Sequence, residues 1–141
     1  MLIHMQVVRE NSVRYLAITP RDNAMKVIGL DNLFCGGEKS GLFVGHTEAI
    51  STGSLAGANA VRHAAGKNMI VLPNETVIGD IIDFANKKFL KDKDKKSRFT
   101  FAGSIYFNRM KEIGLYSTDS KEIEDRITRL GLKGIFNEKV V

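Results

Sequence analysis

Residues 31–53, DNLFCGGEKSGLFVGHTEAISTG, change character twice and decide the fold of the chain around them. The apolar triplet Leu33–Phe34–Cys35 predicts a short buried strand, and two glycines follow it directly. From His46 to about Ala65, small side chains recur at spacings of three and four, which predicts a helix with a small-residue stripe. Each glycine inside a helix costs roughly 1 kcal/mol relative to alanine. We therefore expect this helix to lie very close to another backbone or to a ligand.

The flanking sequence predicts additional short strands and three more helices. The strands are expected over residues 2–8, 13–19 and 68–74, the first two joined as a hairpin near residues 10–12. The helices are expected over residues 75–90, 104–113 and 120–130. We expect Asn74 to cap the helix over 75–90, and Asp119 or Ser120 to cap the last helix. The buried face of the last helix is expected to comprise Ile123, Ile127 and Leu130.

This order of elements predicts an α/β or α+β fold with few short strands. A glycine turn leads into the small-residue helix, and the C-terminal region is mainly helical. The strands are too few for a complete doubly wound sheet, so the chain is expected to form part of a larger fold.

The composition places the chain among ordinary cytoplasmic domains. It has 141 residues, 43% hydrophobic and 26% charged, with no apolar run near the roughly 20 residues that span a bilayer. The N-terminal residues have no secretion signal, and a single cysteine fits a reducing compartment. Metal binding is not expected, because one cysteine and three scattered histidines (His4, His46, His63) show no ligand spacing.

The net charge of +5 favours anionic partners, and much of it lies in residues 87–98, KKFLKDKDKKSR. This segment holds seven Lys or Arg residues against two Asp. Contact with nucleic-acid phosphates is one interpretation and a solvated loop is the preferred one. The candidate nucleic-acid residues are Lys87, Lys88, Lys91, Lys95, Lys96 and Arg98.

The glycine turn has the composition of a ligand site. A strand that ends in Gly36–Gly37 and leads into a helix exposes backbone N–H groups, which attract phosphate or a partly negative oxygen. Glu38 is placed to accept hydrogen bonds from sugar or polyol hydroxyls, and Gly41 and Gly45 would let a flat ligand approach. The alternative is a tight turn whose glycines only provide positive φ. Neither G-x-x-x-x-G-K-[ST] nor G-x-G-x-x-G occurs in the chain.

Three stretches, DNLFCGGE, GHTEAISTGSLAGANAVRHAAGK and VLPNETVIGDIIDF, closely resemble the C-terminal part of a flavoprotein family. This family comprises the folate- and FAD-dependent tRNA uracil-5-methyltransferases and the glucose-inhibited division A proteins. The resemblance covers roughly residues 27–108, where FTFAGSIYF resembles the aromatic segment that follows in those enzymes. It departs from them at Glu38, where they usually have Gln, and in a loop that is one residue longer.

The resemblance implies that residues 1–90 are the distal part of an FAD-binding domain, followed by a basic loop and small helical region over 91–141. Glu38 would face the ribityl chain, and the small-residue helix would point its N-terminus at the isoalloxazine ring. Glu48 matches a family position near the flavin, although a glutamate in the first turn also simply suits the helix dipole. His46 could bind a flavin carbonyl, although a surface or capping role is the preferred interpretation for His46. The implied cofactor-binding residues are Gly36, Gly37, Glu38, Gly41, Gly45, His46, Thr47 and Glu48.

No catalytic residue is expected in this chain. The active-site cysteines of the methyltransferases have no counterpart, and Cys35 is interpreted as a buried small hydrophobe. The resemblance implies an FAD-dependent oxidoreductase or methyltransferase-like parent, with tRNA as a partner. This chain alone would be inactive, and FAD is the cofactor expected of the complete protein, with the missing N-terminal half as a partner; whether this chain alone binds FAD stays open.

Two alternatives dispense with flavin. One is a basic RNA-binding module and the other is a module that buries its apolar faces by forming a homo-oligomer. Tyr106, Phe107 and Phe136 are expected in a core or interface rather than as base-stacking platforms.

Overall fold

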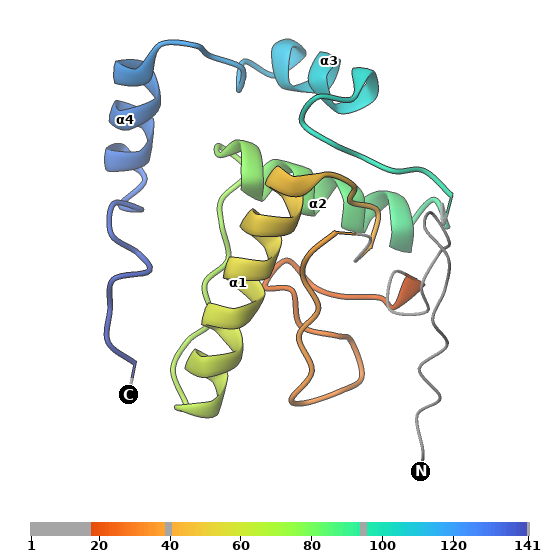
Figure 1. The fold of residues 1–141 in the computed structure, drawn as a ribbon, viewed down its shortest axis with the longest axis vertical. Helices are drawn as coiled ribbons and strands as arrows, with labels where there is room; N and C mark the ends of the chain where they lie inside the picture. Colours follow the sequence, from red (N-terminus) through yellow and green to blue (C-terminus); the bar gives the residue numbers. More distant parts are fainter. Residues whose placement is uncertain (1–17, 39–40, 94–95, 141) are drawn as a thin grey trace.

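The computed structural model describes residues 18–38, 41–93 and 96–140, and this part is mostly helical (Figure 1). The helices are α1 (His46–Ala64), α2 (Val77–Leu90), α3 (Ser104–Glu112) and α4 (Ser120–Arg129). All four agree with the predicted helices to within two residues at each end. The predicted strand over 2–8 and most of that over 13–19 lie outside the described residues.

Strand pairing in the described ranges is reduced to isolated bridges. They join Arg21 to Val27 and Lys26 to Phe34 in antiparallel fashion, and Phe43 to Phe99 in parallel. The expected strand over residues 33–35 therefore amounts to a single bridged residue, and Leu33 is exposed although Cys35 is buried. The expectation of an α/β fold is met in its helices and only weakly in its strands.

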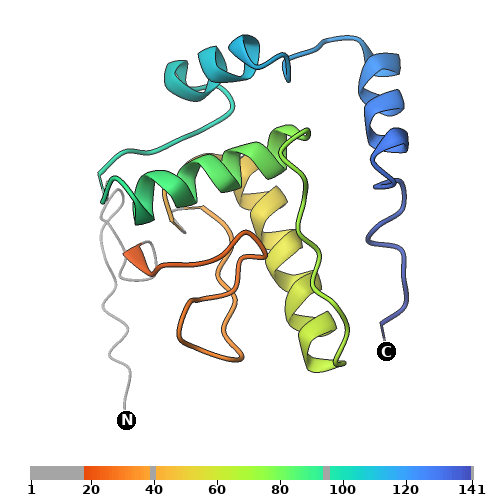
Figure 2. The same ribbon diagram turned by 180° about the vertical axis from the view of Figure 1, so that it is seen from behind.

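The core lies around the contact between α1 and α2, which cross in both views (Figures 1 and 2). Leu55 and Ala56 of α1 and Ile81, Ile82 and Ala85 of α2 are buried there. The chain before α1 also reaches this core through Met25, Leu42 and Phe43. The small side chain of Ala56 suits the close packing that the sequence predicts for α1.

A buried asparagine joins α1 to segments on both sides of it. Asn59 is 0% exposed, and its Nδ2 donates to the carbonyls of Ala24 (2.9 Å) and Ile70 (2.8 Å). Its Oδ1 accepts from the backbone N–H of Ile70 at 2.7 Å. Ile70 and Leu72 are buried while Val71 between them is exposed, as in a strand, yet no strand partner occurs in the described part. Asn59 thus supplies the hydrogen bonds that a neighbouring strand would otherwise provide.

The start of α2 differs from the sequence prediction at its cap. The N-cap is Thr76 rather than Asn74, because the Thr76 hydroxyl accepts from the backbone N–H of Gly79 at 3.0 Å. The amide of Asn74 instead donates to Asp83 at 3.0 Å. Gly79 lies against the carbonyls of Leu72 and Pro73, so no side chain fits at this position.

A buried carboxylate holds α3 against α2. Asp80 accepts hydrogen bonds from Arg109 Nε (2.9 Å) and Nη2 (2.7 Å). It accepts a third from the Tyr106 hydroxyl (2.9 Å). The Arg109 guanidinium also lies over the Phe84 ring, 4.8 Å from its centroid. Burial, the hydrogen bond and the negative charge of Asp80 all raise the pKa of Tyr106, and the hydrogen bond to Asp80 raises that of Arg109. Tyr106 lies in the core, as predicted.

The helix α4 stands apart from the α1–α2 body (Figure 1). Its Asp119 cap is confirmed by bonds from the N–H groups of Lys121 and Glu122. The expected buried face is wrong, because no residue of α4 is buried and Ile123 is 43% exposed. Ile123 and Ile127 instead line a cavity of about 240 Å³ that they share with residues of α2 and α3.

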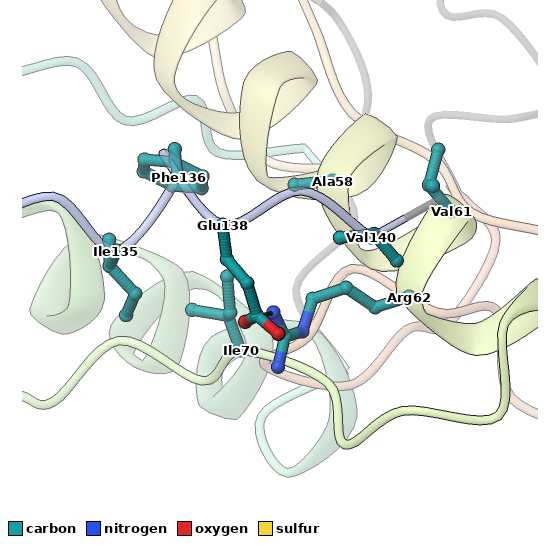
Figure 3. Close-up of a pocket in the computed structure, with 8 residues that line it drawn as sticks. All are labelled: Ala58, Val61, Arg62, Ile70, Ile135, Phe136, Glu138 and Val140. Carbon is teal, nitrogen blue, oxygen red and sulfur yellow. Dashed lines mark hydrogen bonds and ion pairs between the residues drawn. The ribbon is translucent and has the colours of Figure 1, made fainter.

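The C-terminal segment runs back along the last turns of α1 (Figure 3). Glu138 accepts from Arg62 at 2.7 Å and from Lys67 at 2.8 Å. Beside these ion pairs is a cavity of about 250 Å³ with mostly apolar walls, including Val61 and Phe136. Phe136 is 51% exposed and is therefore not a core residue.

We predict that Asn59→Ala lowers the free energy of unfolding by about 2–4 kcal/mol, because it leaves buried backbone groups of Ala24 and Ile70 without partners. Urea denaturation followed by circular dichroism measures this change. Asn108→Ala, at an exposed position in α3, is the matched control and should stay within about 0.5 kcal/mol of the wild type. Equal destabilisation by the two variants would contradict the bridging role of Asn59.

The Lys67 and Arg62 side chains lower the pKa of Glu138 to about 2, from an ordinary value of 4.5. The folded state therefore gains from these ion pairs above pH 4.5 and loses that gain as the pH falls towards 2. Carbon-detected NMR titration of the Glu138 carboxyl group should show this low midpoint. Lys67→Gln should raise it, whereas Lys121→Gln on the exposed surface of α4 should not. A wild-type midpoint near 4.5 would refute the paired arrangement.

Candidate functional site

The glycine turn lies against the middle of α1. A Cβ atom on Gly36 would overlap the Thr52 carbonyl oxygen and lie 2.8 Å from the Cα of Gly53. The N–H of Gly37 donates to Thr52 Oγ1 at 2.9 Å, and the same hydroxyl donates to the Glu48 carbonyl at 2.7 Å. The close approach that the sequence predicts is therefore present, and its partner at Gly36 is the helix itself.

Three more glycines of the turn adopt conformations that side chains rarely tolerate. Gly37, Gly41 and Gly45 have φ of +104°, +80° and +117°, and Gly45 is the N-cap residue of α1. A Cβ on Gly37 would meet no atom within 4 Å, so this glycine borders open space. The turn therefore divides into Gly36, which packs inward, and Gly37, which faces outward.

The N-terminus of α1 has no side-chain cap. Gly45 has no side chain to accept from the first-turn N–H groups, whereas Thr76 and Asp119 cap α2 and α4 in this way. The first four N–H groups of a helix lack partners within the helix. His46 and Thr47 in this turn are exposed. A ligand at this end of α1 would therefore meet free backbone donors and two accessible side chains.

Glu48 differs from its neighbours in the same turn. Its side chain is 2% exposed, and Oε1 accepts from the backbone N–H of Phe101 at 2.5 Å. Its other carboxylate oxygen occupies the space in which Gly45 would carry a side chain. Glu38 is exposed, so of the two acidic candidates only Glu38 faces solvent.

Arg21 is buried beside the turn and stabilises it through hydrogen bonds. The sequence alone does not predict this role. Arg21 donates from Nη1 to the Cys35 carbonyl at 3.0 Å and from Nη2 to the Thr19 carbonyl at 3.1 Å. Its guanidinium carbon lies 3.3 Å from where Gly41 would carry a Cβ. Burial lowers its pKa. The Thr19 carbonyl is local in sequence, whereas the Cys35 carbonyl is 14 residues away and is brought near only by the fold, so no local pattern around residue 21 indicates burial.

The basic candidates are more neutralised than their sequence suggests. Lys87 pairs with Asp83 and Lys88 with Asp92, while Lys91 is exposed. Burial alone would raise the pKa of Asp83, but hydrogen bonds from Lys87 and Asn23 hold it below its ordinary value. Lys96 and Arg98 are also engaged in interactions, and Lys95 lies outside the described residues. Arg98 also lines a small cavity together with Phe99 and Thr100.

A small cavity of about 120 Å³ is lined by residues 98–100 and by the start of α3, and it is near α1 through the proximity of Thr100 to Gly45. Phe99, Thr100 and Gly103 are among its lining residues, and Thr100 Oγ1 lies 3.5 Å from where Gly45 would carry a Cβ. Within the described ranges, no group of three or more His, Cys, Asp or Glu could hold a metal ion. No helix there is long and apolar enough to cross a membrane.

Comparison with known families assigns this region. The family model of glucose inhibited division protein A matches residues 4–68, which include the whole glycine turn and all of α1. Residues 4–68, slightly less than half of the chain, are therefore similar to this family. The match does not extend over residues 69–108, where the family resemblance stays a prediction.

Curated relatives agree with the family match. The chain is 36% identical over 70 residues to methylenetetrahydrofolate–tRNA-(uracil-5-)-methyltransferase TrmFO of Prochlorococcus marinus subsp. pastoris, covering 49% of this chain and 15% of that protein. It is 43% identical over 53 residues to TrmFO of Caldicellulosiruptor bescii, covering 38% and 12%. It is 40% identical over 68 residues to the tRNA uridine 5-carboxymethylaminomethyl modification enzyme MnmG of Synechocystis, covering 48% and 10%.

The likeness to these enzymes is confined to a short stretch. The chain spans at most 15% of the length of these three relatives. No solved structure matches it significantly. The similarity to the glucose inhibited division protein A family is therefore limited to this stretch, and the activities of the whole relatives do not follow from it.

We predict that Gly36→Ala destabilises the fold by about 1–3 kcal/mol, because the added methyl group overlaps the Thr52 carbonyl. Gly57→Ala is the control on the exposed side of α1, where a Cβ meets nothing within 4 Å. It should stabilise the protein by about 0.5–1 kcal/mol through helix propensity. Urea denaturation of both variants measures whether each substitution lowers or raises the free energy of unfolding. A stabilising effect of Gly36→Ala would refute the contact.

Proposed function

We propose that this chain forms the flavin-facing part of an FAD site, built from the glycine turn and the N-terminus of α1. The observation that carries the proposal is the family match, which covers this turn and helix together. Proteins of this family are flavoproteins. The uncapped first turn of α1 supports the proposal further, because its free N–H groups suit the carbonyl oxygens of a flavin ring.

The exposed side chains of the turn are suited to the polyol part of the cofactor. Glu38 follows the open-faced Gly37, and its carboxylate can accept hydrogen bonds from ribityl hydroxyls. His46 and Thr47 are accessible at the end of α1, where they would border the ring. Gly36 and Gly41 take a structural role in this proposal, since each packs against a neighbouring part of the chain.

We propose that a second polypeptide segment completes the site. The cavity beside α1 holds about 120 Å³, whereas pockets for ligands of drug size occupy roughly 300–1,000 Å³. The chain also has no G-x-G-x-x-G turn to hold the adenosine diphosphate half of the cofactor. A partner that carries such a turn would supply that half, and any catalytic step would take place in the assembled protein rather than in this chain alone.

We propose that the assembled protein acts on tRNA. The relatives are named for acting on tRNA, and the chain carries a net charge of +5. The exposed Lys91 is the basic candidate that contributes most plainly to such a surface, since Lys87 and Lys88 are paired with carboxylates. A purely RNA-binding role without flavin has less support for the same reason.

Titration of the purified chain with FAD, followed by flavin fluorescence and calorimetry, tests the proposal. We expect weak saturable binding that riboflavin competes with and ADP does not, because the chain would contact the flavin end. Glu38→Ala should weaken it roughly tenfold, the effect of losing one hydrogen bond to a charged group.

Glu75→Ala, an exposed position outside the turn, is the matched control and should leave the affinity unchanged. Competition by ADP in place of riboflavin would mean that the wrong half of the cofactor is assigned to this chain. No saturable binding up to millimolar FAD would contradict the proposal for the isolated chain.

A further inference from the structure

We propose that Glu48 is a positioning residue of the FAD site, whose buried carboxylate fixes the segment after α2 against the N-terminus of α1. The inference rests on the proposed function for its consequence on flavin binding. It differs from the sequence-based expectation, in which Glu48 touches the cofactor. The carboxylate is 2% exposed and bonded to Phe101, so it would act through that segment.

The burial of this charge requires an explanation, because a first-turn glutamate can reach solvent at little cost. Removing a carboxylate from water costs several kcal/mol unless hydrogen bonds and opposite charge offset it. Here the positive end of the α1 dipole and the N–H of Phe101 provide that offset. No buried side-chain oxygen or nitrogen among the described residues lacks a hydrogen-bond partner. The carboxylate is therefore held inward by specific partners.

Gly45 makes room for this arrangement. Its φ of +117° already favours glycine, and a Cβ there would overlap one carboxylate oxygen of Glu48. Glycine at position 45 therefore permits both the positive φ of the turn and the inward position of the Glu48 carboxylate. Any larger residue at position 45 would push Glu48 away from Phe101.

The segment that Glu48 holds is also joined to the glycine turn. Phe99 donates its N–H to the Leu42 carbonyl at 2.7 Å and accepts from the Val44 N–H at 3.2 Å. Two residues later, Phe101 bonds to Glu48 and its ring lies 6.0 Å from that of Tyr106. Residues 42–44, 48 and 99–101 therefore form one joint between parts of the chain more than 50 residues apart in sequence.

This joint forms one side of the candidate site. The lining of the cavity includes Phe99, which forms the bridge to the turn, and Thr100, which lies between that bridge and the Phe101 bond to Glu48. If the joint opens, the wall moves while the glycine turn and α1 can stay in place. Glu48 would then determine the affinity for the flavin without contacting it.

Amide hydrogen exchange by NMR tests the joint directly, without flavin. We expect Glu48→Ala to speed exchange at the Phe101 amide at least tenfold, since its acceptor is lost. Glu48→Gln keeps an acceptor oxygen and should preserve most of the protection. Glu75→Ala and Glu75→Gln, at an exposed position, serve as controls that should leave this amide unchanged.

FAD affinity of the same variants supplies the second measurement. Glu48→Ala should weaken binding roughly tenfold, and Glu48→Gln should restore most of the loss. Unchanged Phe101 protection in Glu48→Ala would overturn the positioning role. Lost protection with unchanged affinity would overturn its link to the cofactor. An equal loss in Glu48→Gln and Glu48→Ala would also overturn the hydrogen-bond argument.

The two proposals can fail separately. If the wild-type chain binds no FAD, the proposed function falls for the isolated chain. The exchange measurement would still decide whether Glu48 fixes the segment. Circular dichroism detects whether Glu48→Ala unfolds. If it does, the comparison of Glu48→Gln with Glu75→Gln still tests the hydrogen bond. Protection of the Phe101 amide in Glu48→Gln would support the hydrogen bond, and its loss there would contradict it.

Discussion

The contact between Gly36 and the backbone of α1 at Thr52 constrains how the glycine turn packs on that helix. It brings the chain before the helix within van der Waals distance of the helix backbone, which only a residue without a side chain permits. The Thr52 hydroxyl then accepts from Gly37 and donates to Glu48, so one side chain ties the turn to the first turns of α1. With this contact in place, the loop from Gly41 to Gly45 has a short path to the helix N-terminus.

Buried polar side chains replace strand pairing as the means of fixing the segments around α1 and α2. Asn59 satisfies both backbone groups of Ile70, Asp80 binds two side chains of α3, and Glu48 binds the N–H of Phe101. Each lies on a helix and reaches a segment that is distant in sequence. Such groups stabilise only when all their partners are present, so they specify one arrangement of the segments and penalise others.

The sequence predicts the helices well and their polar partners poorly. The periodicity of α1 and the cap at Asp119 are local signals, and both are confirmed. Thr76 rather than Asn74 caps α2, because the Thr76 hydroxyl reaches the N–H of Gly79 while the Asn74 amide donates to Asp83. The apolar residues of α4 were expected to be buried, yet periodicity shows only which face is apolar and not whether another element covers it.

The candidate site shows the same limit. Glycine spacing and the family resemblance locate the turn, but they treat Glu38 and Glu48 alike as acidic residues near a flavin. The fold separates them, with one carboxylate in solvent and one buried on Phe101. Nothing in the local sequence marks Arg21 either, because its bond to the Cys35 carbonyl joins residues 14 apart in sequence. Residues with distant partners become visible only when the chain is folded.

An uncapped helix N-terminus is not sufficient to indicate a ligand, since α3 also begins after a glycine without a side-chain cap. What distinguishes α1 is the combination of features at that end. Gly37 and Gly45 have positive φ, Glu48 is buried, and the family match covers the same residues. A glycine N-cap costs a few tenths of a kcal/mol relative to Ser, Thr, Asn or Asp, and a buried carboxylate has a desolvation cost that its partners must offset. A helix end that combines these costs with an accessible surface favours a function there over stability alone, which is why the proposed flavin contact lies at α1 and not at α3.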